Sequence, residues 1–194
     1  NYCKEKGGAV IGERQSTLSF VRTKFINNRS SIGSVAYFAA TDKVTFTNCL
    51  FKGNSALGIG TLVTLDNRLI IIDSSEFLEN ELKGTSEVIS VFSAFQISHS
   101  NFQGAAGEES TIFSLNTMSS ASLKNCTLSY LHGKGQAFNI ANSVLTIESS
   151  VVENFYGGSE AGGIEAQSFS TVWISKTTFS NCTVDNEGGS IQLA

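Results

Sequence analysis

The sequence predicts an all-β fold, a parallel β-helix in which successive coils of about 26 residues stack on one another. Three observations predict it: a motif that recurs at nearly constant spacing, two columns of apolar residues in register with that motif, and the absence of proline. Proline lacks the N–H that a sheet ladder needs, so its absence fits a chain that is strand nearly everywhere.

The recurring motif is Phe-x-x-Asn, as in FINN at 25–28, FKGN at 51–54 and FLEN at 77–80. The first residue of each motif is called the anchor of its coil, and later positions continue the series. The seven anchors are Phe25, Phe51, Phe77, Phe102, Leu128, Val152 and Phe179. Their successive spacings are 26, 26, 25, 26, 24 and 27 residues, which predicts seven to eight coils.

Two apolar columns lie seven and five residues before the anchors. The earlier column holds Leu18, Val44, Ile70, Phe95, Ala121, Leu145 and Val172. The later column holds Phe20, Phe46, Ile72, Ile97, Leu123, Ile147 and Ile174. Five of the seven residues that lie between the two columns are polar, and Trp173 is one of the other two. This alternation predicts one strand per coil with a buried face and an outward face.

Corners of the coil are predicted at two further columns. Two residues before the anchor all seven positions are small: Thr23, Cys49, Ser75, Ser100, Cys126, Ser150 and Thr177. Three residues after the anchor the first three coils carry Asn28, Asn54 and Asn80. Asn can bond the backbone of its neighbours and tolerates unusual dihedral angles, so it suits a repeated corner.

Stacking explains why every coil carries an apolar residue in each of these columns. A unit of 26 residues cannot bury its own apolar face, but parallel pairing at about 4.8 Å per coil places like residues on like. Burying each large apolar side chain contributes roughly 1.5–3 kcal/mol. A β-sandwich could also give alternation, but it would not keep every column aligned across seven units.

The open ends of the predicted solenoid bear on its partners. The sequence begins inside one motif and ends just after the first strand of an eighth coil. We therefore expect residues 1–194 to form a single β-helix domain that is a segment of a longer solenoid. An uncapped end is an exposed sheet edge, so we expect further coils or self-association with another subunit there.

The paired motifs resemble a known repeat family. FINN, FKGN and FLEN, together with GGAV at 7–10, GGIE at 162–165 and GGSI at 188–191, resemble the repeats of chlamydial polymorphic outer-membrane proteins and of similar protist surface proteins. That resemblance implies a right-handed β-helix of the pectin-lyase-like type, located outside the cell or on its surface and acting in adhesion and surface display. The coils of Phe102, Leu128 and Val152 depart from the motif.

Charge and composition argue against nucleic acid as a partner and against a membrane-spanning segment. The 194 residues have a formal net charge of −4 without charge runs, which gives no footprint for nucleic acid. The longest apolar runs are too short for a membrane-spanning segment.

Catalytic chemistry is not predicted. The four aspartates, Asp42, Asp66, Asp73 and Asp185, fall in different columns, so the clustered carboxylates of polysaccharide lyases and hydrolases are not expected. His99 is assigned no Asp in its own or an adjacent column, and it and His132 are interpreted as surface residues. We expect neither a metal site nor a cofactor.

The four cysteines are predicted to be thiols. Cys49 and Cys126 share a column but lie three coils apart, about 14 Å, which exceeds the reach of a disulfide. Cys182 is expected to be buried with them, whereas Cys3 could bridge to a segment outside this sequence.

Three Asn-x-Ser/Thr triplets are possible glycosylation sites: Asn28, Asn125 and Asn181. Asn28 is the weakest of them because its column is a structural corner. Asn125 and Asn181 are expected to point outward.

A partner contact is predicted where aromatic residues replace the corner Asn. Tyr130, His132 and Tyr156 follow successive anchors and are expected on neighbouring coils of one edge, as a lateral contact with another chain. Leu131 and Phe155 lie beside these residues in the sequence. For these two the alternative is that they fill the interior at the position that Asn occupies in other coils.

The sequence therefore favours a non-enzymatic, extracellular structural or adhesive β-helix that builds a surface structure or filament, with protein partners and possible glycan. The alternative is a carbohydrate-binding or polysaccharide-cleaving β-helix whose site lies outside these coils.

Overall fold

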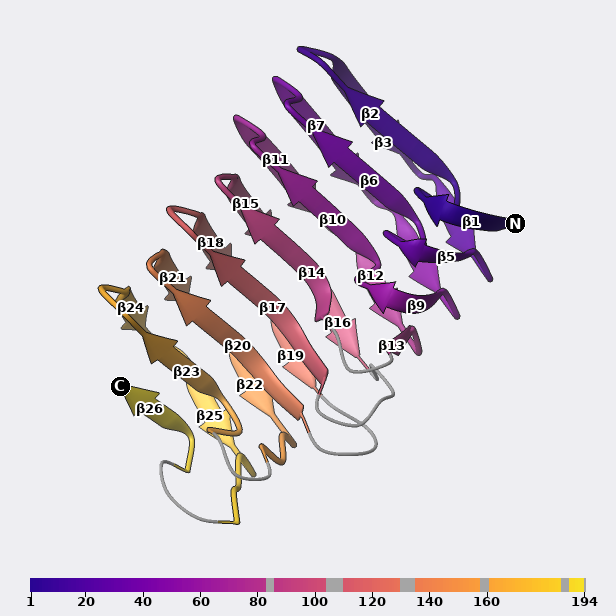
Figure 1. Cartoon of the computed structure of the whole chain (residues 1–194). Helices are drawn as coiled ribbons and strands as arrows, with labels where there is room; N and C mark the ends of the chain where they lie inside the picture. The colour runs from indigo at the N-terminus through magenta and orange to yellow at the C-terminus, as the bar shows by residue number, and fades with distance from the viewer. Residues whose placement is uncertain (83–85, 104–109, 130–134, 158–160, 186–188, 194) are drawn as a thin grey trace.

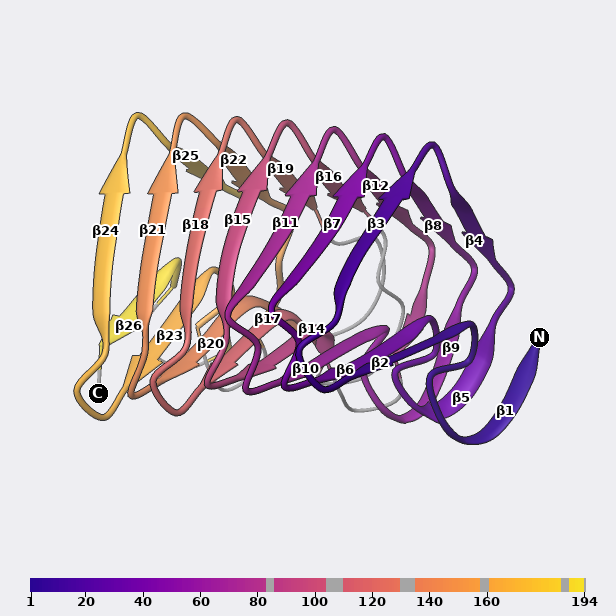
Figure 2. The ribbon, with the colours of Figure 1, turned by 90° about the horizontal axis from the view of Figure 1, so that it is seen from above.

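The computed structural model describes residues 1–82, 86–103, 110–129, 135–157, 161–185 and 189–193. These residues form a solenoid of parallel strands with the two termini at opposite ends (Figures 1 and 2). Each turn contributes one strand to each of two seven-stranded sheets, so the solenoid has about seven turns. No described segment is helical, and therefore none is a long apolar helix that could cross a membrane.

Four sheets run along the solenoid axis, here named sheets A to D in the order in which β1 to β4 enter them. Sheet B contains β2 (Val10–Glu13), β6 (Ala36–Ala39), β10 (Leu62–Leu65), β14 (Ser86–Val91), β17 (Ser110–Asn116), β20 (Gly135–Ala141), β23 (Ile164–Gln167) and β26 (Ile191–Leu193). Sheet C contains β3 (Thr17–Val21), β7 (Lys43–Thr47), β11 (Leu69–Asp73), β15 (Ala94–Ser98), β18 (Ser120–Lys124), β21 (Val144–Glu148) and β24 (Thr171–Ser175). Figure 2 shows the strands of sheet C side by side in one row.

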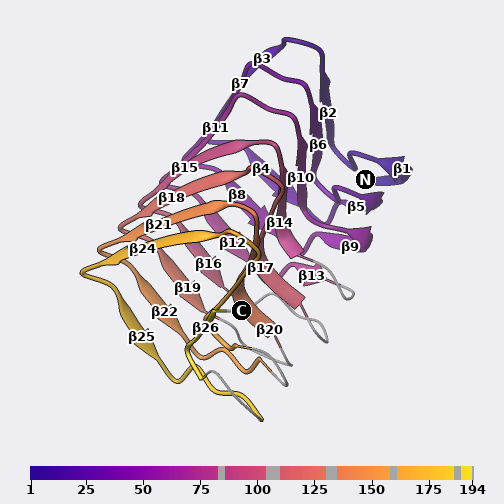
Figure 3. The same ribbon diagram turned by 60° about the vertical axis from the view of Figure 1, so that its left-hand side comes forward.

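Sheet D carries the anchors, and sheet A is shorter. Sheet D contains β4 (Lys24–Ile26), β8 (Leu50–Lys52), β12 (Glu76–Leu78), β16 (Asn101–Gln103), β19 (Thr127–Ser129), β22 (Val151–Glu153) and β25 (Thr178–Ser180). Sheet A contains β1 (Tyr2–Lys6), β5 (Arg29–Ile32), β9 (Ser55–Ile59) and β13 (Glu81–Leu82), beside the N-terminal coils (Figure 3).

The register confirms the predicted columns. Within sheet D each anchor pairs with the next, from Phe25 to Phe179. Within sheet C both apolar columns align strand by strand. Burial of the later column is complete from Phe46 to Ile147, but Ile174 is exposed because β24 has a sheet neighbour on one side only.

The anchors form the predicted stack of rings. The ring centroids of Phe51 and Phe77 are 4.1 Å apart, and those of Phe77 and Phe102 are 4.4 Å apart, with nearly parallel planes. Phe25 extends the stack at 5.0 Å from Phe51. These rings belong to one continuous core that is enclosed by the inner faces of sheets B, C and D.

Left-handed residues form the corners. The residue three before each anchor has a positive φ in all seven coils, as with Asn48 (53°) and Asn125 (54°). A second left-handed residue precedes the corner Asn column, for example Asn27 (54°) before Asn28. The residue before the corner Asn therefore turns the chain, and Asn28 faces inward.

Inward-facing polar residues link the coils at these corners. Asn54 Oδ1 accepts the backbone N–H of Asn28 at 2.9 Å, and Asn80 Oδ1 accepts the N–H of Asn54 at 2.8 Å. Asn54 Nδ2 donates in turn to the carbonyl of Phe25 at 3.0 Å. Because each amide satisfies buried groups on a neighbouring coil, this asparagine ladder fixes the stacking register.

The small-residue column forms a second ladder. Ser75 Oγ accepts the N–H of Cys49 at 3.0 Å and donates to the carbonyl of Asp73 at 3.0 Å. Ser150 makes the equivalent bonds to Cys126 and Glu148. Only a small side chain with a donor and an acceptor can make both bonds in so tight a corner, which explains the composition of the column.

Candidate binding groove

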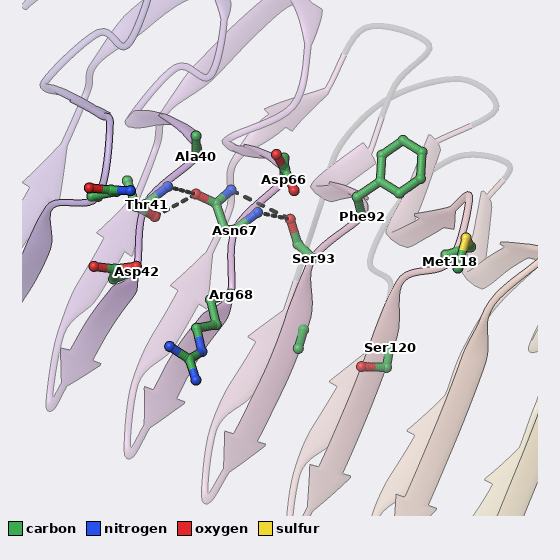
Figure 4. A pocket seen from close by; sticks show the side chains of 12 residues that line it. Ala40, Thr41, Asp42, Asp66, Asn67, Arg68, Phe92, Ser93, Met118 and Ser120 are labelled. Carbon is green, nitrogen blue, oxygen red and sulfur yellow. Dashed lines mark hydrogen bonds between the residues drawn. The ribbon is translucent and has the colours of Figure 1, made fainter.

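A surface groove of about 490 Å³ lies at the corner between sheets B and C (Figure 4). A third polar ladder forms its floor: Asn67 Oδ1 accepts the N–H of Thr41 at 2.9 Å, and Ser93 Oγ accepts the N–H of Asn67 at 3.0 Å. The side chains that enter the groove come from coils on both sides of this ladder.

One extra residue in each of two neighbouring coils shapes the groove. Ser93 is followed directly by Ala94, the first residue of β15. In the two preceding coils an additional residue, Asp42 or Arg68, separates the ladder residue from the start of β7 or β11. Both additional residues are exposed, and both line the groove. The insertion thus places an acidic and a basic side chain on adjacent coils.

The charged groups of the groove form no ion pairs within the described part of the chain. Asp66 adds a second carboxylate to that of Asp42. The ion pairs of the described residues lie elsewhere, as between Lys52 and Glu79, and none of them involves Arg68. A guanidinium and two carboxylates without ion-pair partners offer both donors and acceptors to a polar ligand.

Two large apolar side chains stand on the rim. Phe92 and Met118 are 50% and 73% exposed, and both have a positive φ, 52° and 56°. This conformation is uncommon for bulky residues, and here it turns both side chains away from the core. The groove therefore combines an aromatic face, a thioether and charged groups on one surface.

A second polar cluster crosses three coils at the corner between sheets C and D. His99 Nδ1 lies 3.1 Å from Asp73 Oδ1, and Asn125 Nδ2 lies 3.2 Å from His99 Nε2. Because the Asn125 amide donates, Nε2 accepts and Nδ1 carries the proton that is donated to Asp73. Hydrogen bonds from Ser98 and His99 lower the pKa of Asp73.

This cluster corrects one part of the interpretation of His99, which is exposed at the surface as expected. The sequence columns assigned it no neighbouring Asp, but Asp73 lies four residues before its anchor and His99 three before the next. The columns are therefore adjacent. The Ser98 hydroxyl donates to Asp73 at 2.6 Å rather than to the imidazole, so the cluster does not have the arrangement of a serine nucleophile and its base.

The predicted glycosylation sites differ in their surroundings. Asn28 is buried in the asparagine ladder, as its column indicated. Asn125 and Asn181 are exposed at corners, as expected. That any of them carries a sugar stays a prediction.

The predicted lateral contact is described only in part. Tyr130, Leu131 and His132 lie outside the described residues. Phe155 is fully buried, so it fills the interior where Asn stands in earlier coils. Tyr156 is half-buried, and its hydroxyl donates to Asp185 on the following coil. The hydroxyl of Tyr156 is thus engaged within the chain, and the partner contact stays a prediction.

All four cysteines are thiols in the structure. Cys49, Cys126 and Cys182 are buried, as predicted, and Cys3 is half-buried. Burial raises the pKa of the Cys126 and Cys182 thiols. These thiols take the donor role of the hydroxyl ladder, since Cys126 Sγ contacts the Lys124 carbonyl at 3.3 Å.

The sequence columns did not predict the groove, although they contain a signal for it. Ladder residues precede their anchors by nine positions in most coils, but Thr41 and Asn67 precede theirs by ten. This difference can be recognised only once the ladder column is known.

Comparison with the sequence profiles of known protein families gives no match, and neither does comparison with curated proteins.

Proposed function

We propose that the protein is a non-enzymatic structural or adhesive β-helix, displayed outside the cell, which contributes to a surface structure or filament. The observation that carries the proposal is that the repeated polar residues form hydrogen bonds between neighbouring coils. Asn28, Asn54 and Asn80 bond from coil to coil, and the hydroxyl columns do the same. The repeating chemistry of the chain thus serves stacking, as in a scaffold.

The repeat resemblance supports the same proposal. The Phe-x-x-Asn segments and the GGAV, GGIE and GGSI segments are similar to the repeats of chlamydial polymorphic outer-membrane proteins and of protist surface proteins, whose right-handed, pectin-lyase-like β-helices act in adhesion and display. The asparagine ladder supplies a physical reason for the Asn in such a repeat, because that residue accepts one backbone N–H and donates to one backbone carbonyl on neighbouring coils.

Assembly is part of the proposal. β3 and β24 are the outermost strands of sheet C, and outermost strands can pair with further coils or with another subunit. The predicted contact at Tyr130, His132 and Tyr156 would be lateral and separate from this end-to-end pairing.

The location and the absence of catalysis are tested separately. Antibodies raised against the chain are expected to label intact cells of its source, and labelling only after permeabilisation would contradict surface display. Sedimentation is expected to show association that grows with concentration. Incubation with acidic and neutral polysaccharides is expected to release no product. Product release would contradict the non-enzymatic proposal.

A second candidate function is carbohydrate binding, which the groove favours. Phe92 offers an aromatic face, and Arg68, Asp42 and Asp66 offer hydrogen bonds suited to sugar hydroxyl groups. This site lies on the described coils, whereas the sequence columns placed such a site outside them.

The test is binding to the same polysaccharide panel by an Arg68→Ala, Phe92→Ala double variant. If the groove binds a glycan, the affinity falls at least tenfold while a Trp173→Ala variant, altered on the exposed face of β24, binds as the unchanged protein does. Equal binding by all three proteins would remove the groove as the site.

A further inference from the structure

The corner geometry distinguishes three triplets that look alike in the sequence. At the corners on either side of sheet D, a left-handed residue is followed by a residue whose side chain faces inward. Asn125 and Asn181 occupy the left-handed position, with φ of 54° and 52°. Asn28 occupies the inward position, one residue after the left-handed Asn27. A shift of one residue therefore decides whether the amide meets water or the core.

Asn28 has no room for a substituent. Its side chain is 3% exposed, and its Nδ2 donates to Asn54 Oδ1 at 3.0 Å. The same Asn54 oxygen accepts the Asn28 backbone N–H. A sugar on Asn28 Nδ2 would have to displace the neighbouring coil, because protein interiors leave no voids of that size.

Asn125 and Asn181 meet the opposite conditions. Both are exposed, and each is followed by a buried Cys and then by Thr127 or Thr183. Their Nδ2 atoms contact exposed side chains, His99 at 3.2 Å and Asn154 at 3.1 Å. The remainder of each triplet is thus anchored in the fold while the acceptor amide points to solvent.

We propose that Asn125 and Asn181 are N-glycosylation sites of the folded protein and that Asn28 is not, an inference that rests on passage of the chain through a secretory route. The donor is an oligosaccharide linked to a lipid pyrophosphate. A bond forms between Asn Nδ2 and sugar C1 while the bond from C1 to the pyrophosphate oxygen breaks. The lipid pyrophosphate leaves, and Nδ2 gives up one proton, so the transfer involves no oxidation or reduction.

The placement of the two sugars leaves the groove open. Asn125 lies at the corner between β18 and β19, where sheets C and D meet, and Asn181 follows β25 of sheet D. The groove lies at the corner between sheets B and C. Glycosylation is therefore compatible with either function proposed above.

The sequence contains a matched position at which one substitution would create a new glycosylation triplet. Asn48 lies in the same column as Asn125, is exposed, has a φ of 53° and is likewise followed by a buried Cys. It differs in having Leu50 where Asn125 has Thr127. Leu50→Thr completes the triplet, and Leu50→Val is the control that alters the same position without completing it.

The test is expression of the whole chain in a eukaryotic secretory host beside a known glycoprotein that reports the competence of the host. Peptide mapping with and without peptide-N-glycosidase is expected to show sugar on Asn125 and Asn181 and an unmodified Asn28. Leu50→Thr is expected to add one further sugar, on Asn48, and Leu50→Val none. Circular dichroism confirms that each secreted variant is folded.

Sugar on Asn28 in the folded protein, or bare Asn125 and Asn181 when the reporter is modified, would overturn the proposal. A bare Asn48 in folded Leu50→Thr would overturn the corner rule on which it rests. Because the host supplies the secretory route, these outcomes depend only on the geometry of the sites. They are independent of the antibody test, which asks whether the protein is displayed on the cells of its source.

Discussion

Glu87 is a carboxyl group inside the fold, and its replacement by Gln is expected to change how stability depends on pH. The side chain lies on β14, is 2% exposed, and accepts a hydrogen bond from Asn80 Nδ2 at 3.1 Å where the asparagine ladder ends. Burial raises the pKa of Glu87 from its ordinary 4.5 to about 7, although hydrogen bonds from Thr61 and Asn80 act in the opposite direction.

The sign of the effect follows from the raised pKa. The folded state holds the proton more tightly than the unfolded chain, so the contribution of Glu87 to stability is fully present below about pH 4.5. It is lost as the pH rises through 7. A shift from 4.5 to about 7 corresponds to about 3 kcal/mol at 1.36 kcal/mol per pKa unit. The Glu87→Gln variant retains an uncharged side chain of similar shape and should not lose this contribution.

The assay is urea denaturation of both proteins between pH 4.5 and 8.5. The free energies of unfolding are expected to be similar near pH 4.5, and the variant is expected to be more stable by up to about 3 kcal/mol at pH 8.5. The other titrating groups cancel in the difference between the two proteins. Glu76→Gln, altered at an exposed carboxylate on β12, is the control and should show no comparable pH-dependent difference.

A difference between Glu87→Gln and the unchanged protein that is constant with pH would refute the reasoning. So would a variant that loses stability relative to the unchanged protein as the pH rises. Either result would mean that the Glu87 carboxylate is solvated or paired in a way that burial at β14 does not allow.

Three further predictions concern the core, the ladder and the thiols. Phe77→Ala should cost about 3–5 kcal/mol by leaving a cavity between two stacked rings, whereas exposed Phe92→Ala should change stability by less than about 0.5 kcal/mol, both read by urea denaturation. Asn54→Ala should cost about 1–3 kcal/mol for each buried partner that it leaves unpaired, and stability equal to that of the unchanged protein would contradict the ladder. Cys49 and Cys126 should resist alkylation in the native protein, and both should react in denaturant without reductant; a peptide map linking them would show that the coil register is wrong.

The sequence by itself determined the coil. A solenoid repeats by translation, so every residue that stacks on its equivalent leaves a column at one spacing. The spacing alone therefore places Phe25, Phe51, Phe77 and Phe102 on top of one another. The burial of Cys49 and Cys126 follows from the same columns. The ring stack and the thiols are thus properties of the period.

Only the tertiary structure decided the features that depend on an offset between columns. The pairing of Asp73 with His99 joins two columns that are one residue apart, and the inward turn of Asn28 depends on the left-handed Asn27 before it. The groove arises where Asp42 and Arg68 each lengthen a coil by one residue, and Glu87 on β14 accepts a hydrogen bond from Asn80, which follows β12. A periodic pattern records which residues share a column, whereas these features depend on offsets between columns at the corners, where direction is set by the backbone dihedral angles of single residues.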